Sequence, residues 1–248
     1  SHALFSDARE MLDAVQPDIV HIASDTDAHI PLLRLALECK VPVIVLEKPV
    51  AQTIEEARAV FPLVEKAERT KASRVVVNHE RRFAADYRAV RDLIHGGELG
   101  PLLSVRADLH MGKTKAPESL LWHDGTHLAD ILSFLAGPWS VTAVHGKATA
   151  TEGSFLAIGE TTDSRRIPIV IDASPGRDHL VFELELSFAS GRVRVGNGVY
   201  EVWKSEKARL YEGFRSLALA RGKPGAGWGK TGYFSGMMAH AVVLFRDS

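Results

Sequence analysis

The sequence is short of cysteine, of long apolar runs and of net charge, and each shortage excludes a class of protein. Its 248 residues include one cysteine, Cys39, so no intrachain disulfide can form, and its apolar helical surroundings predict a buried small residue. No apolar run approaches the ~18 residues of a membrane span, and no signal peptide is visible. The formal net charge of −1 gives no field that would attract nucleic acid or anionic membranes. We therefore expect a cytoplasmic protein with neither nucleic acid nor a membrane as partner.

A glycine-rich phosphate-binding loop is also lacking. A dinucleotide site needs G-x-G-x-x-G at the turn after the first strand of its sheet. Residues 225–230, GAGWGK, carry lysine where the third glycine belongs. As a P-loop the same stretch would need glycine at position 224, which is Pro224, and no apolar strand leads into it. The sequence alone thus shows no cradle for a nucleotide phosphate.

Strand and helix signals alternate through residues 1–80. Short apolar strands are predicted over 18–23, 41–46 and 74–78, with amphipathic helices between them. This alternation predicts right-handed βαβ crossovers and a parallel sheet, and the continuous apolar runs are typical of strands covered on both faces. A complete Rossmann-type sheet has about six strands, so we interpret residues 1–80 as the C-terminal half of such a domain.

The pattern changes after residue 80. The predicted elements are helices over 83–94, 126–135 and 233–245, a strand over 102–110, several strands between 140 and 203, and a glycine-rich loop over 214–232. Residues 81–248 are therefore expected to form an α+β domain with a large, mostly antiparallel sheet. The predicted fold class is α/β followed by α+β. The arginine doublet at 81–82 is interpreted as a solvated surface pair.

Polar side chains follow each of the three predicted parallel strands, at the edge where open α/β sheets bind ligands. They are Ser24, Asp25, Thr26 and His29 after the first strand, Glu47, Lys48 and Pro49 after the second, and Asn78 after the third. Lys48 directly follows a buried run. A lysine at such a partly desolvated position can donate a hydrogen bond or shuttle a proton near a substrate oxygen.

A second polar cluster occupies residues 123–130, HDGTHLAD. His123 and His127 are four residues apart, and Asp130 follows one turn later, so the three could ligate zinc or iron. Alternatively, His127 is an acid/base group whose tautomer a nearby carboxylate selects. Gly125 argues against a continuous helix through both histidines and so weakens the metal interpretation. Both interpretations stay open at this level.

These motifs together resemble one family of oxidoreductases. The matching stretches, in family order, are ALFSDAREML at 3–12, DIVHIASDTDAH at 18–29, VIVLEKPVA at 43–51, NHERRF at 78–83, GELGP at 97–101 and HDGTHLAD at 123–130. They resemble the glucose-fructose oxidoreductase / inositol dehydrogenase / rhizopine catabolism (Gfo/Idh/MocA) family, from residue 3 to about 245. The resemblance implies a Rossmann domain, NAD or NADP as cofactor, and a C-terminal sheet through which the protein forms a homo-oligomer.

The resemblance also implies roles for single residues. Lys48 matches the family lysine that contacts substrate and nicotinamide, and His127 matches the histidine that takes the hydroxyl proton. The implied lining of the nicotinamide site is Ser24, Thr26, His29 and Glu47, to which we add Asp25, Pro49 and Asn78 at the same strand ends. The family often has aspartate four residues before the histidine, where this chain has His123 followed by Asp124. Either residue is a candidate for supporting His127.

The resulting hypothesis is hydride transfer between nicotinamide and a small substrate, namely a sugar, a polyol or a related hydroxy compound. One alternative is a metal-dependent hydrolase that uses His123, His127 and Asp130. A second alternative is a non-catalytic binding or scaffold protein. The glycine fingerprint that usually precedes these motifs is not found, so the sequence leaves NAD and NADP equally open.

Overall fold

The computed structural model describes residues 3–112, 120–149, 152–208, 212–222 and 233–246, which form two compact units. The first unit contains the described residues up to Glu80 together with those from Phe234 onward, and the second runs from Arg81 to Tyr233. The sequence predicts a single domain over 81–248, whereas most of helix α7 (Tyr233–Arg246) belongs to the first unit. Met237 and Ala241 are fully buried. A helix joins the core that buries its apolar stripe, and sequence order alone does not identify that core.

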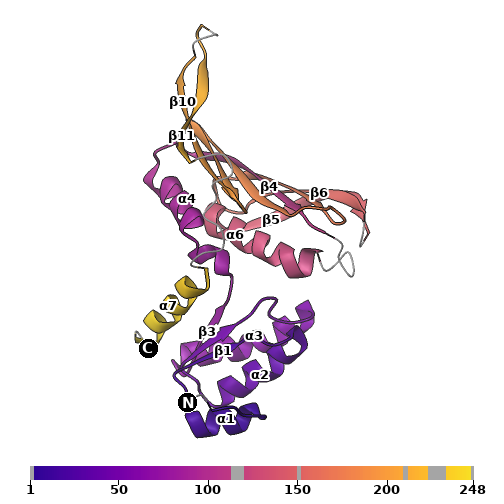
Figure 1. Cartoon of the computed structure of the whole chain (residues 1–248), viewed down its shortest axis with the longest axis vertical. Coiled ribbons are helices and arrows are strands. Elements are labelled where there is room, and N and C mark those ends of the chain that lie inside the picture. The colour runs from indigo at the N-terminus through magenta and orange to yellow at the C-terminus, as the bar shows by residue number, and fades with distance from the viewer. Residues whose placement is uncertain (1–2, 113–119, 150–151, 209–211, 223–232, 247–248) are drawn as a thin grey trace. The chain divides into compact units, whose positions relative to one another are not determined.

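A three-stranded parallel sheet in the order β1–β2–β3 forms the centre of the first unit (Figure 1). Its strands are β1 (Ile19–Ile22), β2 (Val43–Leu46) and β3 (Arg74–Val77), and its helices include α1 (Ala8–Val15), α2 (Thr26–Glu38) and α3 (Ile54–Arg69). All four side chains of β2 are fully buried. Ile44 and Leu46 join the cluster under the helices, while Val43 and Val45 point to the opposite face. This confirms the predicted parallel sheet with a central strand covered on both sides.

The helix starts of the first unit follow local hydrogen bonding. Thr53 Oγ1 accepts from the backbone N–H of Glu56 at 3.2 Å, as in a capping box. The Glu56 carboxylate in turn accepts from the N–H of Gln52 at 3.1 Å, one residue earlier than the ideal motif. Asp25 occupies the N-cap position of helix α2, although its side chain makes no capping hydrogen bond, and the helix is followed by Cys39, which is half-buried rather than fully buried.

The second unit is built on an eight-stranded sheet in the order β11-β10-β9-β8-β4-β7-β6-β5. Its strands are β4 (Leu102–His110), β5 (Trp139–Ala148), β6 (Gly153–Thr161), β7 (Pro168–Ser174), β8 (Val181–Phe188), β9 (Gly191–Gly196), β10 (Val199–Lys207) and β11 (Arg215–Gly222). The pair β4–β7 is parallel, and the other six pairs are antiparallel. The predicted mostly antiparallel sheet is thereby confirmed.

Helices cover one face of this large sheet. The 3₁₀ turn η1 (Glu80–Phe83) leads into α4 (Ala85–Gly96), and α6 (Thr126–Ala136) lies on the same side of the sheet (Figure 1). Alternate strand residues such as Leu184 and Leu186 pack with Ile131 and Leu132 of α6 in one apolar core. No helix within the described ranges is long and apolar enough to cross a membrane. The expected cytoplasmic location stays a prediction.

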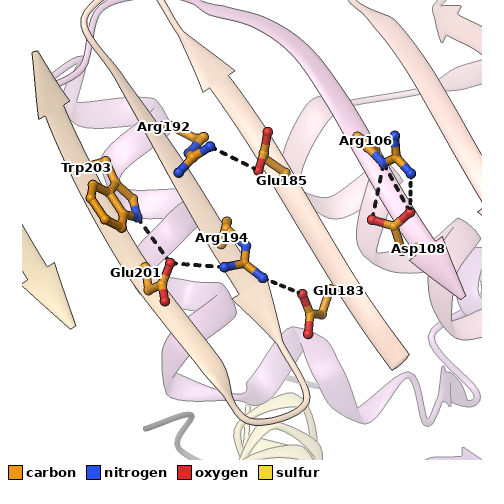
Figure 2. Close-up of polar contacts among 8 residues, drawn as sticks. All are labelled: Arg106, Asp108, Glu183, Glu185, Arg192, Arg194, Glu201 and Trp203. Carbon is orange, nitrogen blue, oxygen red and sulfur yellow. Dashed lines mark hydrogen bonds and ion pairs between the residues drawn. The ribbon is translucent and has the colours of Figure 1, made fainter. Parts of the chain in front are cut away.

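The opposite face of the sheet carries paired charges (Figure 2). Arg194 bonds Glu183 at 3.0 Å and Glu201 at 3.3 Å, which joins β8, β9 and β10. Arg106 bonds Asp108 at 3.0 Å on its own strand. Opposite charges therefore neutralise one another along a face that the helices leave uncovered.

Strand β11 departs from the predicted loop over 214–232. Residues 215–222 pair with β10 in an antiparallel hairpin. Gly222 has φ of +96°, and a Cβ there would lie 2.0 Å from the carbonyl oxygen of Tyr200. Glycine is needed at this strand end because another backbone passes close by, and the sequence cannot show that approach. Residues 223–232, with the stretch GAGWGK, lie outside the described residues.

Candidate active site

Polar groups of all three parallel strands meet at the carboxyl edge of the first unit. Asn78 Nδ2 donates to Glu47 Oε1 at 2.6 Å, and His21 Nε2 lies 3.0 Å from the same oxygen. The backbone N–H groups of Glu47 and Asn78 extend the strand ladders by bonding the carbonyls of Ile22 and Leu46. Two residues predicted from strand ends are thus joined, because parallel strands end at one edge. His21 was missed because it lies inside a strand, and its only signal is a polar residue in an apolar run.

His29 ties the first two strand-end loops together. Its Nδ1 lies 2.8 Å from the carbonyl oxygen of Pro49, and its Nε2 lies 3.1 Å from that of Ser24. Both partners only accept, so a neutral imidazole donates to one of them at a time. With 1% of its surface exposed, the ring sits behind the loops. The His29 imidazole therefore links the backbone after β1, at Ser24, to the backbone after β2, at Pro49.

Lys48 follows Glu47 directly after β2 and is half-buried at this edge. The Lys48–Pro49 peptide bond is cis, an isomer that the sequence allows but does not identify. Ser24 and Asp25 are exposed beside it, and Thr26 is half-buried. The edge therefore offers both donors and acceptors to a ligand.

In the second unit, a π-helical turn leads directly into the helix of His127. The turn η2 (Leu120–Gly125) continues into α6 without a break, and Gly125 has an ordinary helical φ of −63°. The prediction that Gly125 interrupts the helix is therefore wrong. Glycine in a helix interior costs only about 1 kcal/mol, which burial of Leu120 and Leu128 can offset. Single π turns of this kind often occur at functional sites.

The two candidates for supporting His127 contact each other. His123 Nδ1 lies 3.4 Å from Asp124 Oδ1, and the Thr126 hydroxyl donates to the carbonyl of His123 at 3.1 Å. His123 is exposed, while Asp124 and His127 are half-buried. The π turn changes the angular spacing between His123 and His127 from that of an α-helix.

Asp130 is bound by an arginine. Arg82 Nε donates to both carboxylate oxygens, at 2.8 and 2.7 Å, and Arg82 Nη2 lies 2.6 Å from Oδ1. A carboxylate held by this fork is not placed to ligate a metal together with His123 and His127. Within the described ranges, the one group with metal-ligand spacing is instead Asp108, His110 and Asp172, where Arg106 already bonds both carboxylates. The metal-dependent hydrolase is therefore not supported.

A cavity of about 600 Å³ lies next to α6, on the face of the helix opposite to that of His127. Gly125, Thr126, Leu128 and Ala129 line it, together with apolar residues of the sheet. At 100° per residue these positions centre on one face of the helix, while His127 and Asp130 lie on the opposite face. The cavity is therefore not where His127 would meet a substrate.

The known proteins that this chain resembles in sequence include oxidoreductases. Residues 1–78 match the model of the oxidoreductase family with an NAD-binding Rossmann fold. Inositol 2-dehydrogenase of Corynebacterium glutamicum is 30% identical over 137 residues, which cover 54% of this chain and 39% of that protein. D-apiose dehydrogenase of Paraburkholderia graminis is 30% identical over 182 residues, which cover 69% of this chain and 47% of that protein. The chain thus spans less than half the length of these curated relatives.

Solved structures show the same fold. The structure of levoglucosan dehydrogenase in complex with NADH and levoglucosan matches 98% of this chain and 74% of that chain, with a TM-score of 0.72 and 17% identity. A dehydrogenase from Chromobacterium violaceum matches 98% of this chain and 72% of that chain, with a TM-score of 0.75 and 20% identity. At such low identity these likenesses establish the fold alone.

A Rossmann-type parallel sheet with a polar carboxyl edge, followed in the chain by a large, mostly antiparallel sheet, is the fold class that this chain shares with these dehydrogenase structures. Residues 1–78 match the model of the Gfo/Idh/MocA family, which the motifs of the sequence also resemble, and the inositol and apiose dehydrogenases are each 30% identical over the aligned residues. Asn78 Oδ1 is buried at the carboxyl edge and makes no hydrogen bond among the described residues, so it could accept one from a bound cofactor, and Ser24 and Asp25 at the end of β1 are exposed.

Proposed function

We propose that the complete protein is an NAD- or NADP-dependent dehydrogenase that oxidises a hydroxyl group of a sugar, a polyol or a related compound. The observation that carries this proposal is the Glu47-Lys48-Pro49 segment at the carboxyl end of the fully buried central strand. Support comes from the inositol and apiose dehydrogenases among the relatives. NAD is the first candidate cofactor, because the matching family is described as NAD-binding.

Two side chains carry the chemistry in this proposal. His127 accepts the proton of the substrate hydroxyl, and Lys48 donates a hydrogen bond to the substrate. When bound, the nicotinamide ring supplies the acceptor for the hydride that leaves the carbinol carbon. Asp124 and His123 remain alternative partners that orient the His127 imidazole.

The remaining edge residues hold the cofactor and the loops around it. Glu47 and Asn78 form a hydrogen-bonded pair beneath the nicotinamide end, and His29 fixes the loops that contain Ser24 and Pro49. Asp25 and Thr26 complete the polar lining. Orientation of substrate against cofactor by such fixed groups supplies much of the acceleration in this type of reaction.

The test uses the complete protein that contains this chain, assayed with NAD and NADP against inositols, apiose and levoglucosan. We expect Lys48→Ala and His127→Ala each to lower kcat by about 10²–10⁴-fold, the usual loss for an acid/base group. Matched controls are Lys66→Ala and His95→Asn, which change exposed residues on α3 and α4. Normal turnover in either active-site variant contradicts the proposal. Failure of the complete protein to bind NAD(H) or NADP(H) would favour a scaffold protein instead.

We also propose that a second copy of the chain packs against the charged face of the large sheet. Apart from exposed Arg106 and buried Glu201, the charged side chains of this face are half-buried, and arginines lie next to carboxylates, which allows the same surface on two copies to be complementary (Figure 2). Arg106→Glu combined with Arg192→Glu should then lower the molar mass measured by light scattering. Arg58→Glu on exposed α3 is the control, and an unchanged molar mass in the double variant argues against this interface.

A further inference from the structure

Arg82 forms an ion pair with Asp130 of α6, the helix that carries His127. Its guanidinium meets the Asp130 carboxylate through a two-pronged contact, with three N···O distances between 2.6 and 2.8 Å. The carboxylate side chain is only 8% exposed, whereas Arg82 is 41% exposed. A bidentate pair with one desolvated partner is held more firmly than a solvated surface pair.

The contact lies on the same helix face as His127. His127, Asp130 and Phe134 stand at positions i, i+3 and i+7 of α6, which share one side of an α-helix. The Arg82 guanidinium carbon also lies 5.5 Å from the centre of the Phe134 ring. Arg82 therefore covers the two turns that follow His127 on the face from which its side chain projects.

Arg81, the residue before Arg82, contacts the large sheet. Arg81 is 6% exposed, and its guanidinium carbon lies 3.5 Å from the centre of the Phe182 ring on β8. Its Nη1 donates to Asn197 Oδ1 at 3.0 Å, in the turn between β9 and β10. Of the two consecutive arginines of η1, Arg81 thus contacts the sheet and Arg82 contacts α6. The predicted solvated surface pair is wrong for Arg81.

We propose that Arg82 is a positioning residue for His127, acting through Asp130. This inference rests on the proposed function, because it assumes that His127 takes the proton. The pair fixes the rotation and height of the first turns of α6 and neutralises a desolvated carboxylate one turn from the imidazole. Displacement of a reacting group by about 1 Å can cost about 10²-fold in rate, so a rigid link to the sheet matters for turnover.

The experiment compares four variants of the complete protein: Arg82→Gln, Arg82→Lys, Asp130→Asn and the Arg82→Gln/Asp130→Asn double variant. We expect Arg82→Gln to lower kcat per folded molecule by about 10–100-fold, while KM changes much less. Arg82→Lys should recover part of kcat, since it keeps the charge but loses the fork. The double variant should be no worse than Arg82→Gln, because both changes remove the same contact. The control is Arg91→Gln, since exposed Arg91 also stacks on Phe134, at 4.4 Å.

The outcomes separate this inference from the proposed function. Normal turnover of His127→Ala overturns the proposed function. Loss of turnover in His127→Ala with an unchanged kcat in Arg82→Gln overturns the positioning role alone. A lowered Tm with unchanged kcat per folded molecule also overturns it, because the pair would then be merely structural. If Arg82→Gln does not fold, Arg82→Lys and Asp130→Asn decide, and an unchanged kcat in both rejects the inference.

Discussion

The two units solve the same packing problem in opposite ways. In the first unit the central strand is buried on both faces, so the polar side chains of that strand come only after its last residue. In the second unit the helices cover one face of the sheet, and the strands alternate apolar residues with charged ones. Polar chemistry therefore concentrates at a backbone edge in one unit and spreads over a surface in the other.

This difference explains where functional residues lie. In the first unit Glu47, Lys48 and Asn78 stand together because three strands end at the same edge. In the second unit the candidate base His127 comes from a helix on the covered side, and the charged side is left for other contacts. An edge gathers side chains from distant parts of the chain, whereas a sheet face arranges them in a ladder.

The largest expected effect tests burial on both faces against burial on one. Ile44→Asn and Val45→Asn should each destabilise the first unit by about 3 kcal/mol or more, although these neighbours point in opposite directions. In the second unit Leu184→Asn should cost as much, while Glu183→Gln should cost less than about 1 kcal/mol. The loss in the free energy of unfolding is measured by denaturant titration, with hydrogen exchange reporting on each unit separately. A mild effect of Val45→Asn would show that the central strand is not covered on both sides.

The next effect concerns the charge ladder. Arg194→Met removes the partner of Glu201, whose side chain is only 5% exposed, although the indole N–H of Trp203 still donates to it at 3.1 Å. We expect a loss of about 2 kcal/mol in the free energy of unfolding, because a buried carboxylate loses its cation. Adding Glu201→Gln should restore part of it. Equal losses in Arg194→Met and in the more exposed Arg106→Met would mean that burial of Glu201 is unimportant.

A smaller, pH-dependent effect is expected at Asp86 in α4. Burial raises the pKa of the Asp86 carboxyl above its usual 3.8, despite the hydrogen bond from the N–H of Tyr87 and the charge of Arg81. Because the folded pKa is the higher one, the unfolded state ionises first, and this group costs the folded state stability as pH rises from the unfolded pKa through the folded pKa. Asp86→Asn should therefore be more stable than the parent at neutral pH, by about 1 kcal/mol.

The stability difference between Asp86→Asn and the parent, measured from pH 3 to pH 8 (on the order of the range that carboxyl groups titrate), should vanish at the acid end. Asp86 Oδ2 is buried and makes no hydrogen bond among the described residues, so the amide loses little there. A gap that is constant with pH would mean that the effect comes from packing and not from ionisation.

The smallest effect is expected at the half-exposed Glu98. Hydrogen bonds from Lys204 and Arg221 lower the pKa of its carboxyl below the usual 4.5. Because the folded pKa is the lower one, its contribution is present above the unfolded pKa and is lost as pH falls through the folded pKa. Glu98→Gln should thus lower Tm slightly at neutral pH. The difference should shrink in acid and in high salt, and a salt-independent difference would point to packing instead.

Much of the fold follows from local patterns. The three parallel strands and the strands from β5 to β10 were predictable, because strand burial depends on a few neighbouring residues. Strand β11, the unbroken helix through Gly125 and the membership of α7 in the first unit were not. Each of these depends on which distant surface a segment finds, and glycine-rich or apolar sequences are compatible with several surfaces.

The candidate site divides in the same way. Glu47, Lys48 and Asn78 were found because they follow apolar strands, and strand ends can be read locally. His21 lies inside a strand, and Arg82 belongs to a doublet that resembles surface charge. The roles of His21 and Arg82 become visible only through their partners Glu47 and Asp130, which lie 26 and 48 residues away along the chain.

The sequence by itself determined the parallel strands, the polar residues at their carboxyl ends and the family motifs, because these are properties of short segments. Tertiary structure decided which of those residues meet. It joined Glu47 to Asn78 and His21, gave Asp130 to Arg82 rather than to a metal, and turned His127 away from the large cavity. Hydrogen bonds and ion pairs depend on distances of a few ångströms, and only packing of the whole core sets distances between segments far apart in the chain.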